Sequence, residues 1–385
     1  MRIAHISSSG ELSGGAEFCL LDLVKYEKEI GIEPVVVLPK RGGLAKALEA
    51  LEVSYEVIPY LSWRHSTSER ALSSQMKYLI KRPYNLIQEV RLYKSLRCRS
   101  IDLIHINTTA TYAGALTARL LKIPLVWHFR EFNSPNKPHD FYNKASASKA
   151  IKRAQKYIAV SDCMKVFYQE LFNTSNIEVI IDSMNSPESQ RSSDIFSHET
   201  VNIVVVANKM ESKGQIDALE ALLLLMKRNF TNIHLSLVGN EESTSYCTKL
   251  KSFVEANNLK DFVSFEGFSK NPFETLSKAD IALNCSRSES FGRTTVEAMM
   301  MGCIVIGNDN TCTHDLLSDG RGLLYKNPSD LSCKIQWAIE NSEQSKKMAK
   351  RAQEYALSSF NDGNIKIVNL FKATIAEANT GQAID

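Results

Sequence analysis

Two glutamates eight positions apart, Glu289 and Glu297, stand between two short apolar runs of the chain. The first run, residues 280–284, and the second, residues 303–307, have the length and composition of buried strands. A helix is predicted between them, with residues 298–301 in it. In an open α/β sheet, ligands bind beyond the carboxyl ends of the strands. Both carboxylates are therefore expected to face one crevice, and paired carboxylates in a crevice are typical of glycoside hydrolysis.

Each of these glutamates also has a purely structural interpretation. Thr294 with Glu297 three positions later matches the capping box that begins many helices. Ser290 is a second candidate cap for the same helix. Glu289 on its own is an ordinary loop charge. The pair alone therefore leaves structural and functional roles open.

The full motif is more specific than the pair: Glu289-Ser290-Phe291-Gly292, then Glu297-Ala298-Met299, then Gly302 before the next strand. It resembles the donor-sugar signature of the retaining glycosyltransferases of family 4. The resemblance implies an α/β protein of the GT-B fold, in which two Rossmann-like domains with parallel sheets face a central cleft. It implies that Glu297 holds the ribose hydroxyls and Glu289 the donor sugar. Backbone amides near Ser290, Phe291 and Gly292 would contact the diphosphate, so the hydrolase interpretation loses support.

A second motif follows the strand predicted over residues 201–207. It contains Asn208 and Lys209, and then Lys213-Gly214 before a helix predicted over 215–227. Lys213-Gly214 matches the family, whereas Asn208 stands where arginine is common, and Lys209 offers the nearest charge. A cation beside a helix N-terminus is a good anion site, because charge, backbone N–H groups and helix dipole act together. Lys213 and Asn208 are therefore predicted to bind the donor, although Lys213 also reads as a plain surface lysine.

The first half of the chain begins with a strand predicted over residues 2–7 and a loop that contains Gly14-Gly15-Ala16-Glu17. This loop fits neither the dinucleotide fingerprint nor the P-loop. It resembles the first glycine loop of the family, which places Gly15 near the donor diphosphate, or it simply makes a turn. His128 ends a strand predicted over 124–129; by resemblance it lies near the transferred sugar, and the alternative is a satisfied strand-end histidine. His105, inside its strand, is expected to be structural.

A length of 385 residues suits two domains. We predict an N-terminal acceptor-binding domain over residues 1–185, a polar linker over 186–200 and a nucleotide-sugar domain over 201–360. The resemblance implies that the last helix, within 361–385, crosses back to the first domain.

The segment from residue 64 to 99 departs from the alternation of strands and helices. It holds nine Lys or Arg against two glutamates, interleaved with aromatic and aliphatic residues. Pro83 is expected to separate two helical pieces. Such a segment suits an anionic membrane surface, and the alternative is a solvated basic helix pair packed on the core. Nucleic acid is not expected, because the net charge of the chain is only +3 and no binding motif occurs.

Composition narrows the remaining possibilities. No apolar run approaches the roughly 20 residues of a membrane span, and the chain starts directly with a strand rather than a signal peptide. We therefore expect a cytoplasmic protein, peripheral on the inner face of the membrane. No Asp-x-Asp motif or histidine cluster suggests a catalytic metal, and no cofactor is expected besides the nucleotide-diphosphate sugar as co-substrate, with a UDP-sugar favoured over a GDP-sugar.

The sequence thus predicts a retaining glycosyltransferase of hexosyltransferase type. It would move a sugar from a nucleotide sugar to a glycan or lipid-linked acceptor, in cell-surface polysaccharide synthesis. Two alternatives stay open: a nucleotide-sugar epimerase of the same fold, and a non-catalytic protein that binds sugar nucleotides. A dinucleotide-dependent oxidoreductase would need the fingerprint that this chain lacks.

Overall fold

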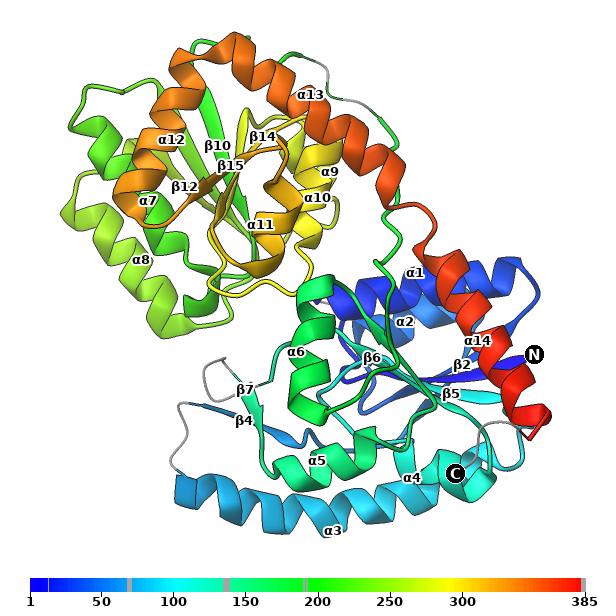
Figure 1. The fold of residues 1–385 in the computed structure, drawn as a ribbon. Coiled ribbons are helices and arrows are strands. Elements are labelled where there is room, and N and C mark those ends of the chain that lie inside the picture. The colour runs from blue at the N-terminus through cyan, green and yellow to red at the C-terminus, as the bar shows by residue number, and fades with distance from the viewer. Residues whose placement is uncertain (13, 68–70, 134–138, 190, 192, 382–385) are drawn as a thin grey trace. The chain divides into compact units, whose positions relative to one another are not determined.

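The computed structural model contains two compact units (Figure 1). It describes every residue except 13, 68–70, 134–138, 190, 192 and 382–385. The first unit comprises residues 1–183 with 362–385, and the second comprises residues 184–361. Residues 186–200, the predicted linker, are grouped with the second unit, and Ile195 is packed in its core. The final helix, α14 (Gly363–Asn379), belongs to the first unit.

The first unit is built on a seven-stranded sheet with the strand order β3-β2-β1-β5-β6-β8-β9. All six pairings in it are parallel. The strands are β1 (Arg2–Ile6), β2 (Glu33–Leu38), β3 (Ser54–Val57), β5 (Leu103–Ile106), β6 (Leu125–Phe129), β8 (Lys156–Ala159) and β9 (Ile177–Val179). Strands buried on both faces need continuous apolar runs, and β2 has one in residues 34–38.

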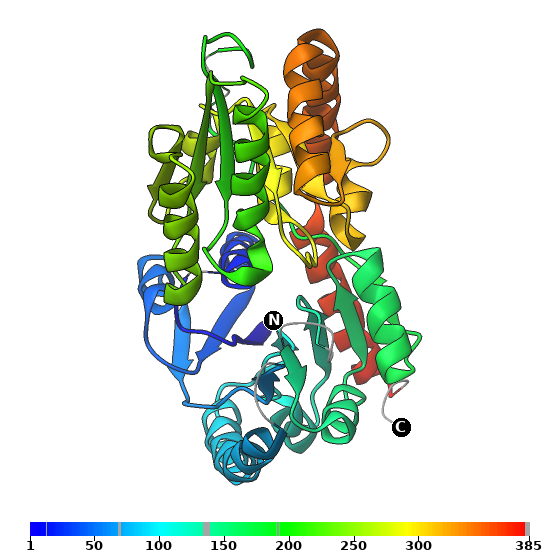
Figure 2. The ribbon, with the colours of Figure 1, turned by 90° about the vertical axis from the view of Figure 1, so that its left-hand side faces the viewer.

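Helices cover both faces of this sheet (Figure 2). α1 (Gly15–Glu29) and α14 pack on one face, where Leu23 and Phe371 join the buried cluster of strand residues. The other helices of the unit are α2 (Gly43–Ala50), α3 (Ala71–Leu96), α4 (Ala115–Leu121), α5 (Lys144–Ile151) and α6 (Asp162–Phe172).

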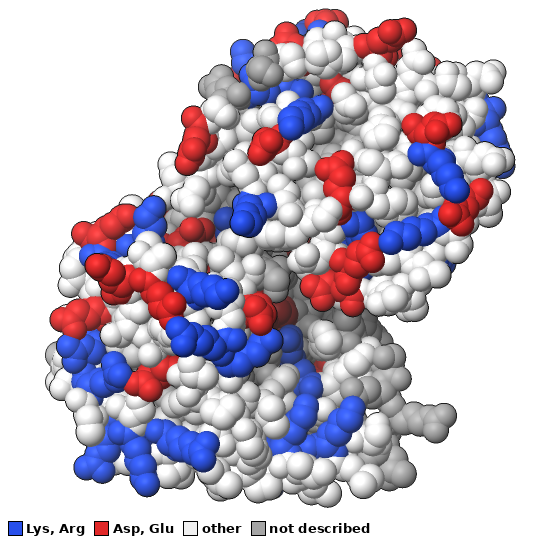
Figure 3. Space-filling view, turned by 180° about the vertical axis from the view of Figure 1, so that it is seen from behind, with Lys and Arg blue, Asp and Glu red and all other residues white. Residues whose placement is uncertain are grey.

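The basic segment forms one helix rather than two. α3 runs through Pro83, so the prediction of two helical pieces was wrong. Tertiary polar contacts hold the helix beyond Pro83: Asn85 exchanges two 2.8 Å hydrogen bonds with the backbone of Leu61, and Glu89 accepts three from the start of α4. Basic side chains lie along the lower margin of this unit, with uncharged side chains between them (Figure 3).

Before α3, the chain forms a short strand that the sequence did not suggest. β4 (Arg64–Ser66) pairs with β7 (His139–Phe141) in a separate antiparallel ribbon. Trp63 anchors it, because its indole N–H donates to the carbonyl of Thr109 and its ring packs on Phe141.

The second unit has a six-stranded sheet with the order β12-β11-β10-β13-β14-β15, again entirely parallel. Its strands are β10 (Val201–Val206), β11 (Ile233–Val238), β12 (Val263–Glu266), β13 (Ile281–Asn284), β14 (Ile304–Asn308) and β15 (Leu323–Tyr325). This order is that of a Rossmann fold. Strands are added on one side of β10 up to β12, and then on its other side from β13 onward, so the strand order reverses between β10 and β13.

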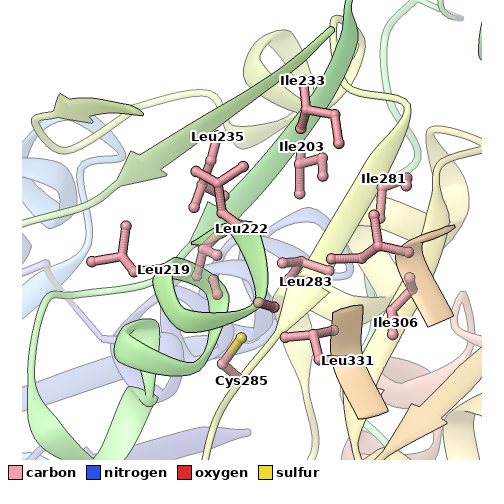
Figure 4. Packing of buried hydrophobic residues seen from close by; sticks show 14 of the residues in the cluster. Ile203, Leu219, Leu222, Ile233, Leu235, Ile281, Leu283, Cys285, Ile306 and Leu331 are labelled. Atoms are coloured by element: carbon pink, nitrogen blue, oxygen red, sulfur yellow. The ribbon is translucent and has the colours of Figure 1, made fainter. Parts of the chain in front are cut away.

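The core of the second unit lies between the sheet and helices that include α7, α8 and α12. Leu219 and Leu222 of α7, and Leu331 of α12, meet strand residues such as Ile203 and Ile281 (Figure 4). The helices of the unit are α7 (Gln215–Met226), α8 (Thr244–Ala256), α9 (Pro272–Leu276), α10 (Arg293–Met300), α11 (Thr311–Leu317), α12 (Pro328–Glu340) and α13 (Ser342–Ser359). Both units therefore have Rossmann-like parallel sheets, as predicted. Within the part of the chain that the structure describes, no helix is long and apolar enough to cross a bilayer.

Candidate active site

The predicted donor residues of the second unit lie where its strand order reverses. β10 and β13 are neighbours in the sheet, with Ile203 opposite Ile281. The loop after β10 carries Lys213, and the loop after β13 carries Glu289. Parallel neighbours end at the same edge of a sheet, so both loops emerge together at the usual ligand position of this fold.

An ion pair joins these two loops. The ammonium of Lys213 lies 3.2 Å from Oε2 of Glu289 and 3.3 Å from Oγ of Ser286. The side chains of Lys213 and Glu289 are 30% and 14% exposed, so the pair is open to solvent on one side. The structure therefore brings together two site residues predicted from motifs 76 positions apart, and it adds Ser286.

The turn that presents Lys213 is fixed by a close backbone approach. Lys213 ends a 3-10 turn, η1 (Glu211–Lys213), and Gly214 follows with φ +64° before α7 begins. A Cβ on Gly214 would lie 2.2 Å from the carbonyl oxygen of Cys285 in the neighbouring loop. Only glycine fits this left-handed, crowded position. The Lys-Gly motif is thus explained by geometry as well as by charge.

Arg287 ties the same loops together from the other side. Its guanidinium makes a bidentate ion pair with Asp217 in the first turn of α7, at 2.7 and 2.6 Å, and Tyr325 donates to the same carboxylate. The backbone N–H of Arg287 donates to the carbonyl of Ser212. This ion pair could not be predicted from the sequence, because nothing in the spacing of Asp217 and Arg287 indicates that they meet.

Glu297 lies in the second turn of α10 rather than at its start. The helix begins at Arg293, and its N-cap is Gly292 with φ +96°. Thr294 is therefore inside the helix, and both cap predictions, the capping box with Thr294 and a cap at Ser290, were wrong. Instead, Oε1 of Glu297 accepts a 3.0 Å hydrogen bond from Arg293 one turn earlier. The carboxylate is only 6% exposed.

The remaining predicted residues of this loop hold its shape. Phe291 is buried against Phe360, with ring centroids 5.7 Å apart. The side-chain amide of Asn310 donates to the carbonyl of Ser286 at 2.6 Å. Asn310 is the N-cap of α11, a helix that was not predicted from the sequence.

The side chains of Asn208 and Lys209 both bond to other parts of the protein. The amide of Asn208 donates to Glu242 at 3.2 Å and accepts from the N–H of Asn240. The ammonium of Lys209 is buried and donates to the carbonyls of Gly239 and Glu266 at 2.6 and 2.5 Å. Burial lowers the pKa of Lys209. Lys209 therefore braces the strand ends and does not replace the arginine that is common at position 208.

In the first unit, Gly15 begins α1, directly after the loop that follows β1. Glu17 in the first turn of α1 is almost fully buried, and Ser8 donates to it at 3.4 Å. Burial, with a smaller contribution from the nearby charge of Glu131, raises the pKa of Glu17 to about 7. Glu131 itself accepts hydrogen bonds from Thr108 and Thr109 at the end of β5. The glycine motif gave no separate indication that Glu17 is buried.

His128 lies in β6, next to its carboxyl end, and is fully buried. Its Nδ1 faces Arg130 and His105 at 3.3 Å each. Burial, then the charge of Arg130, holds the pKa of His128 well below its ordinary value. His128 is therefore neutral at physiological pH. Among the described residues, no group of three or more metal-ligating side chains could hold a metal ion.

Comparison with known proteins agrees with this architecture. The family description "Glycosyltransferase Family 4" matches residues 13–181, and "Glycosyl transferases group 1" matches residues 165–355. The chain is 22% identical, over 98% of both chains, to the capsular polysaccharide biosynthesis glycosyltransferase CapH of Staphylococcus aureus.

Solved structures show the same fold. The structure of Alr3699/HepE from Anabaena in complex with UDP matches with a TM-score of 0.78 and 22% identity, covering 97% of this chain and 100% of that one. A glycosyltransferase from Rickettsia africae also matches with a TM-score of 0.78, at 18% identity, over 97% of this chain and 98% of that one. With a family description over each half and two Rossmann-like sheets, the chain belongs to the family 4 glycosyltransferases and has the GT-B fold.

Proposed function

We propose that this glycosyltransferase transfers a sugar, with retention at the anomeric carbon, from a nucleoside diphosphate sugar to a glycan or lipid-linked acceptor. The observation that carries the proposal is the Lys213–Glu289 pair at the strand-order reversal of the second unit. A UDP-sugar is favoured over a GDP-sugar, since HepE of Anabaena forms complexes with UDP and with UDP-glucose. CapH acts in capsular polysaccharide biosynthesis, which supports a role in cell-surface polysaccharide synthesis.

Lys213 is suited to stabilise the leaving diphosphate. An ammonium has three N–H donors, and Ser286 and Glu289 account for two of them. Among the described residues these are its only side-chain partners, which leaves the third donor for a diphosphate oxygen. The negative charge of the diphosphate grows as the bond to the sugar breaks, so a fixed cation there favours the transition state over the bound substrate.

Glu289 is suited to hold the donor sugar. The contact with Lys213 fixes the direction of its carboxylate, and an ionised carboxylate is an acceptor only. Sugar hydroxyls are donors of matching chemistry, and hydrogen bonds to a charged acceptor are the stronger kind. Glu297, oriented by Arg293, is assigned to the ribose hydroxyls in the same way. Backbone N–H groups around Gly292, at the start of α10, add positive potential for the diphosphate.

His128 and Gly15 are assigned to the same substrate from the first unit. His128 would contact the donor sugar near the reacting carbon, and Gly15 lets the backbone approach the diphosphate without a side chain in the way. Asn208 is assigned to the donor only as a neutral hydrogen-bonding group, since its side chain already bonds Glu242.

We propose that α3 docks on a membrane, so that the acceptor is bound close to the membrane surface. The support is an apolar face on the outside of this helix. Leu79, Ile80 and Ile87 are 68%, 70% and 56% exposed. The spacing of the exposed apolar residues, with Met76, Leu79, Ile80, Pro83, Ile87 and Val90 in the series, is that of one helix face. At 1.5 Å per residue this face is about 21 Å long.

The inward face of the same helix combines polar residues with the buried Leu92 and Leu96. Asn85, Gln88 and Glu89 are buried at 4%, 2% and 2% exposure. Exposed cations flank the apolar face, among them Arg82, Arg91 and Lys94. An apolar stripe with basic borders matches a bilayer with anionic head groups, into which such a helix sinks by roughly 5–10 Å. The enzyme would thereby work at the inner face of the membrane.

A groove beside α3 supports a lipid-linked acceptor. It has a volume of about 530 Å³ and lies between α3, α4 and α5. Leu86, Tyr112 and Leu116 are among its lining residues, and Arg82 and Arg153 add positive charge. Apolar walls with cations suit a lipid chain that carries a phosphate.

The experiment is a thermal-shift screen of the purified protein against UDP- and GDP-sugars, followed by product detection with the sugar that binds. A ligand at 100 times its dissociation constant adds about 2.7 kcal/mol to the free energy of unfolding, so a UDP-sugar should raise the melting temperature by several degrees. If no nucleotide sugar shifts it, the donor assignment is wrong. A change of the sugar's configuration without any acceptor would point to an epimerase instead.

A further inference from the structure

A chain of buried ionisable side chains runs across the sheet of the first unit and ends at His128. His5 on β1, His105 on β5 and His128 on β6 come from three adjacent strands, and His5 is directly opposite His105 in the register. All three side chains are fully buried. Their alignment cannot be seen in the sequence, where they are 100 and 23 positions apart.

The contacts are continuous from α1 to β6. Oε2 of Glu27 lies 2.8 Å from Nε2 of His5, and Nδ1 of His5 lies 3.0 Å from Nδ1 of His105. Nε2 of His105 lies 3.3 Å from Nδ1 of His128. Phe371 of α14 covers the first two histidines, with ring centroids 6.2 and 5.1 Å away. Water is therefore kept from the middle of this row of buried side chains.

The contact with Arg130 determines which ring nitrogen of His128 carries the proton. Its Nη2 lies 3.3 Å from Nδ1 of His128, its Nη1 pairs with Asp182 and its Nε donates to Asn107. A guanidinium donates and never accepts. Nδ1 of His128 must therefore be the acceptor, and the proton of the neutral ring is on Nε2.

The donor and acceptor roles of His105 and His5 follow from the role of His128. Since Nδ1 of His128 accepts, the facing Nε2 of His105 must donate to it, and the two 3.3 Å distances are those of an acceptor shared by two donors. Neutral His105 then accepts at Nδ1, so Nδ1 of His5 donates. At the far end, Nε2 of His5 faces the carboxyl of Glu27 at 2.8 Å. The tautomers of His105 and His128 are thereby fixed.

At the near end, Nε2–H of His128 is a donor that the protein does not use. Nε2 is buried and has no hydrogen-bond partner within the described residues. A buried donor left unpaired costs roughly 1–3 kcal/mol, and buried polar groups in native proteins are almost always satisfied. A retained, unpaired donor beside the carboxyl end of a strand in a Rossmann-like sheet indicates a ligand oxygen.

We propose that Glu27, His5 and His105 are positioning residues, which hold His128 as a neutral imidazole so that its Nε2–H donates to an oxygen of the bound sugar nucleotide. This inference rests on the proposed function and names the residues that set one contact in it. The oxygen is a sugar hydroxyl or a diphosphate oxygen. No proton is transferred: the network orients a neutral donor, which strengthens its bond as charge grows on the oxygen.

The electrostatics of the chain agree with this geometry. Burial, then His5 and Arg130, holds the pKa of His105 well below its ordinary value. For His128 burial acts first, and the charged groups nearest to it are Arg130 and, through Arg130, Asp182. Glu27 and Cys19 approach from α1, and α14 presents the uncharged ring of Phe371. A neutral His128 next to a fixed cation is thus the stable state.

The test combines His105→Phe, His105→Gln and Glu27→Gln with a control, Phe371→Leu, which loosens the same packing without removing a hydrogen bond. The direct readout is the ¹⁵N chemical shift of the His128 ring nitrogens, which distinguishes the tautomers. We expect the Nε2–H form alone in the wild type and in Phe371→Leu. We expect a mixture of tautomers in His105→Phe. His105→Gln, which offers both an acceptor and a donor, should restore the single tautomer in part.

Turnover gives the second readout. In His105→Phe, kcat should fall about tenfold with little change in KM for the donor, and His105→Gln should recover part of the loss. Phe371→Leu should keep kcat within about twofold of the wild type, even if its melting temperature falls as far as that of His105→Phe. A single unchanged tautomer and unchanged kcat in a folded His105→Phe variant would overturn the inference. If the wild type turns over no nucleotide sugar, the proposed function fails, whereas the tautomer measurement still decides on the network.

Discussion

The ammonium of Lys213 lies 3.2 Å from the carboxylate of Glu289, across the point where the strand order of the second unit reverses. Neither residue is placed by its own strand alone. Gly214 sets the turn of Lys213 against the carbonyl of Cys285, and the Arg287–Asp217 pair fixes the loop of Glu289. The proposed donor site therefore depends on two loops that a close backbone approach and a side-chain ion pair hold together.

Replacement of Lys213 by alanine should slow transfer far more than it weakens binding of the sugar nucleotide. We expect kcat to fall by a factor on the order of 10²–10³, the loss seen when one group that stabilises transition-state charge is removed. The measurement is steady-state kinetics beside a direct binding titration. Lys260→Ala, at an exposed lysine of the same unit, is the control and should be neutral. Near-normal turnover of Lys213→Ala would show that this ammonium does not touch the diphosphate.

Glu297→Gln should weaken donor binding. A hydrogen bond to a charged group contributes about 1.5–3 kcal/mol, so the dissociation constant should rise roughly 10- to 150-fold. Calorimetric titration with the donor nucleotide measures it. The substitution also breaks the pair with Arg293, so Arg293→Gln is the matched control. Equal losses in both variants would mean that the pair, rather than a ribose contact of Glu297, explains the effect.

The buried carboxyl of Glu17 should make stability fall as pH rises. Its pKa is raised to about 7 by burial, against an ordinary value of 4.5. Between these values the folded state keeps a proton that the unfolded state has lost, so folding is increasingly penalised, by about 3 kcal/mol once pH exceeds 7. Glu17→Gln removes this pH-dependent penalty on the free energy of folding. Urea denaturation should show the variant gaining roughly 2–3 kcal/mol over the wild type from pH 5 to pH 8. A pH-independent difference would mean that Glu17 is ionised in the folded state.

Membrane docking should depend on both the cations and the apolar face of α3. Each Lys or Arg near an anionic surface contributes about 1 kcal/mol, within a Debye length of roughly 8 Å at physiological salt. In vesicle sedimentation, binding should need anionic lipid and weaken with salt. It should fall when Lys81, Arg82, Arg91 and Lys94 become Gln, and also when Ile80 and Ile87 become Ser.

The control for this experiment removes the same charge elsewhere. Lys347, Lys350, Lys366 and Lys372 are exposed on α13 and α14, and changing them to Gln should leave vesicle binding nearly unchanged. If the wild type ignores anionic vesicles at low salt, α3 does not dock on a membrane and a soluble acceptor becomes the better assignment. If charge removal alone matters and the Ile80 and Ile87 changes do not, the helix lies above the head groups without entering them.

The sequence predicted the parts of this protein whose signals are local. The strand–loop–helix–strand unit around Glu289, and the Lys213-Gly214 turn, are short motifs with fixed spacing. The helix start was mispredicted, because Gly292 adopts φ +96° and begins α10 earlier than a capping box at Thr294 would. Glycine's freedom leaves no side-chain signal for such a cap.

Long-range relations were out of reach for the sequence. His5 and His105 each read as ordinary strand residues, and only the register of β1 against β5 sets their rings together. The basic segment predicted a surface but not which face of α3 points inward, since Asn85 and Glu89 are buried only because Leu61 and the start of α4 supply their partners. Pro83 was given too much weight for the same reason: tertiary contacts kept the helix continuous.

The most direct test of the account is the product formed from a UDP-sugar and a suitable acceptor by the wild type and by Glu289→Gln. NMR of the product gives the configuration at the anomeric carbon. We predict that an α-linked donor gives an α-linked product, and that Glu289→Gln lowers kcat at least 100-fold while the protein remains folded. A β-linked product, or full activity of Glu289→Gln, would contradict the assignment of the Lys213–Glu289 pair to a retaining transfer.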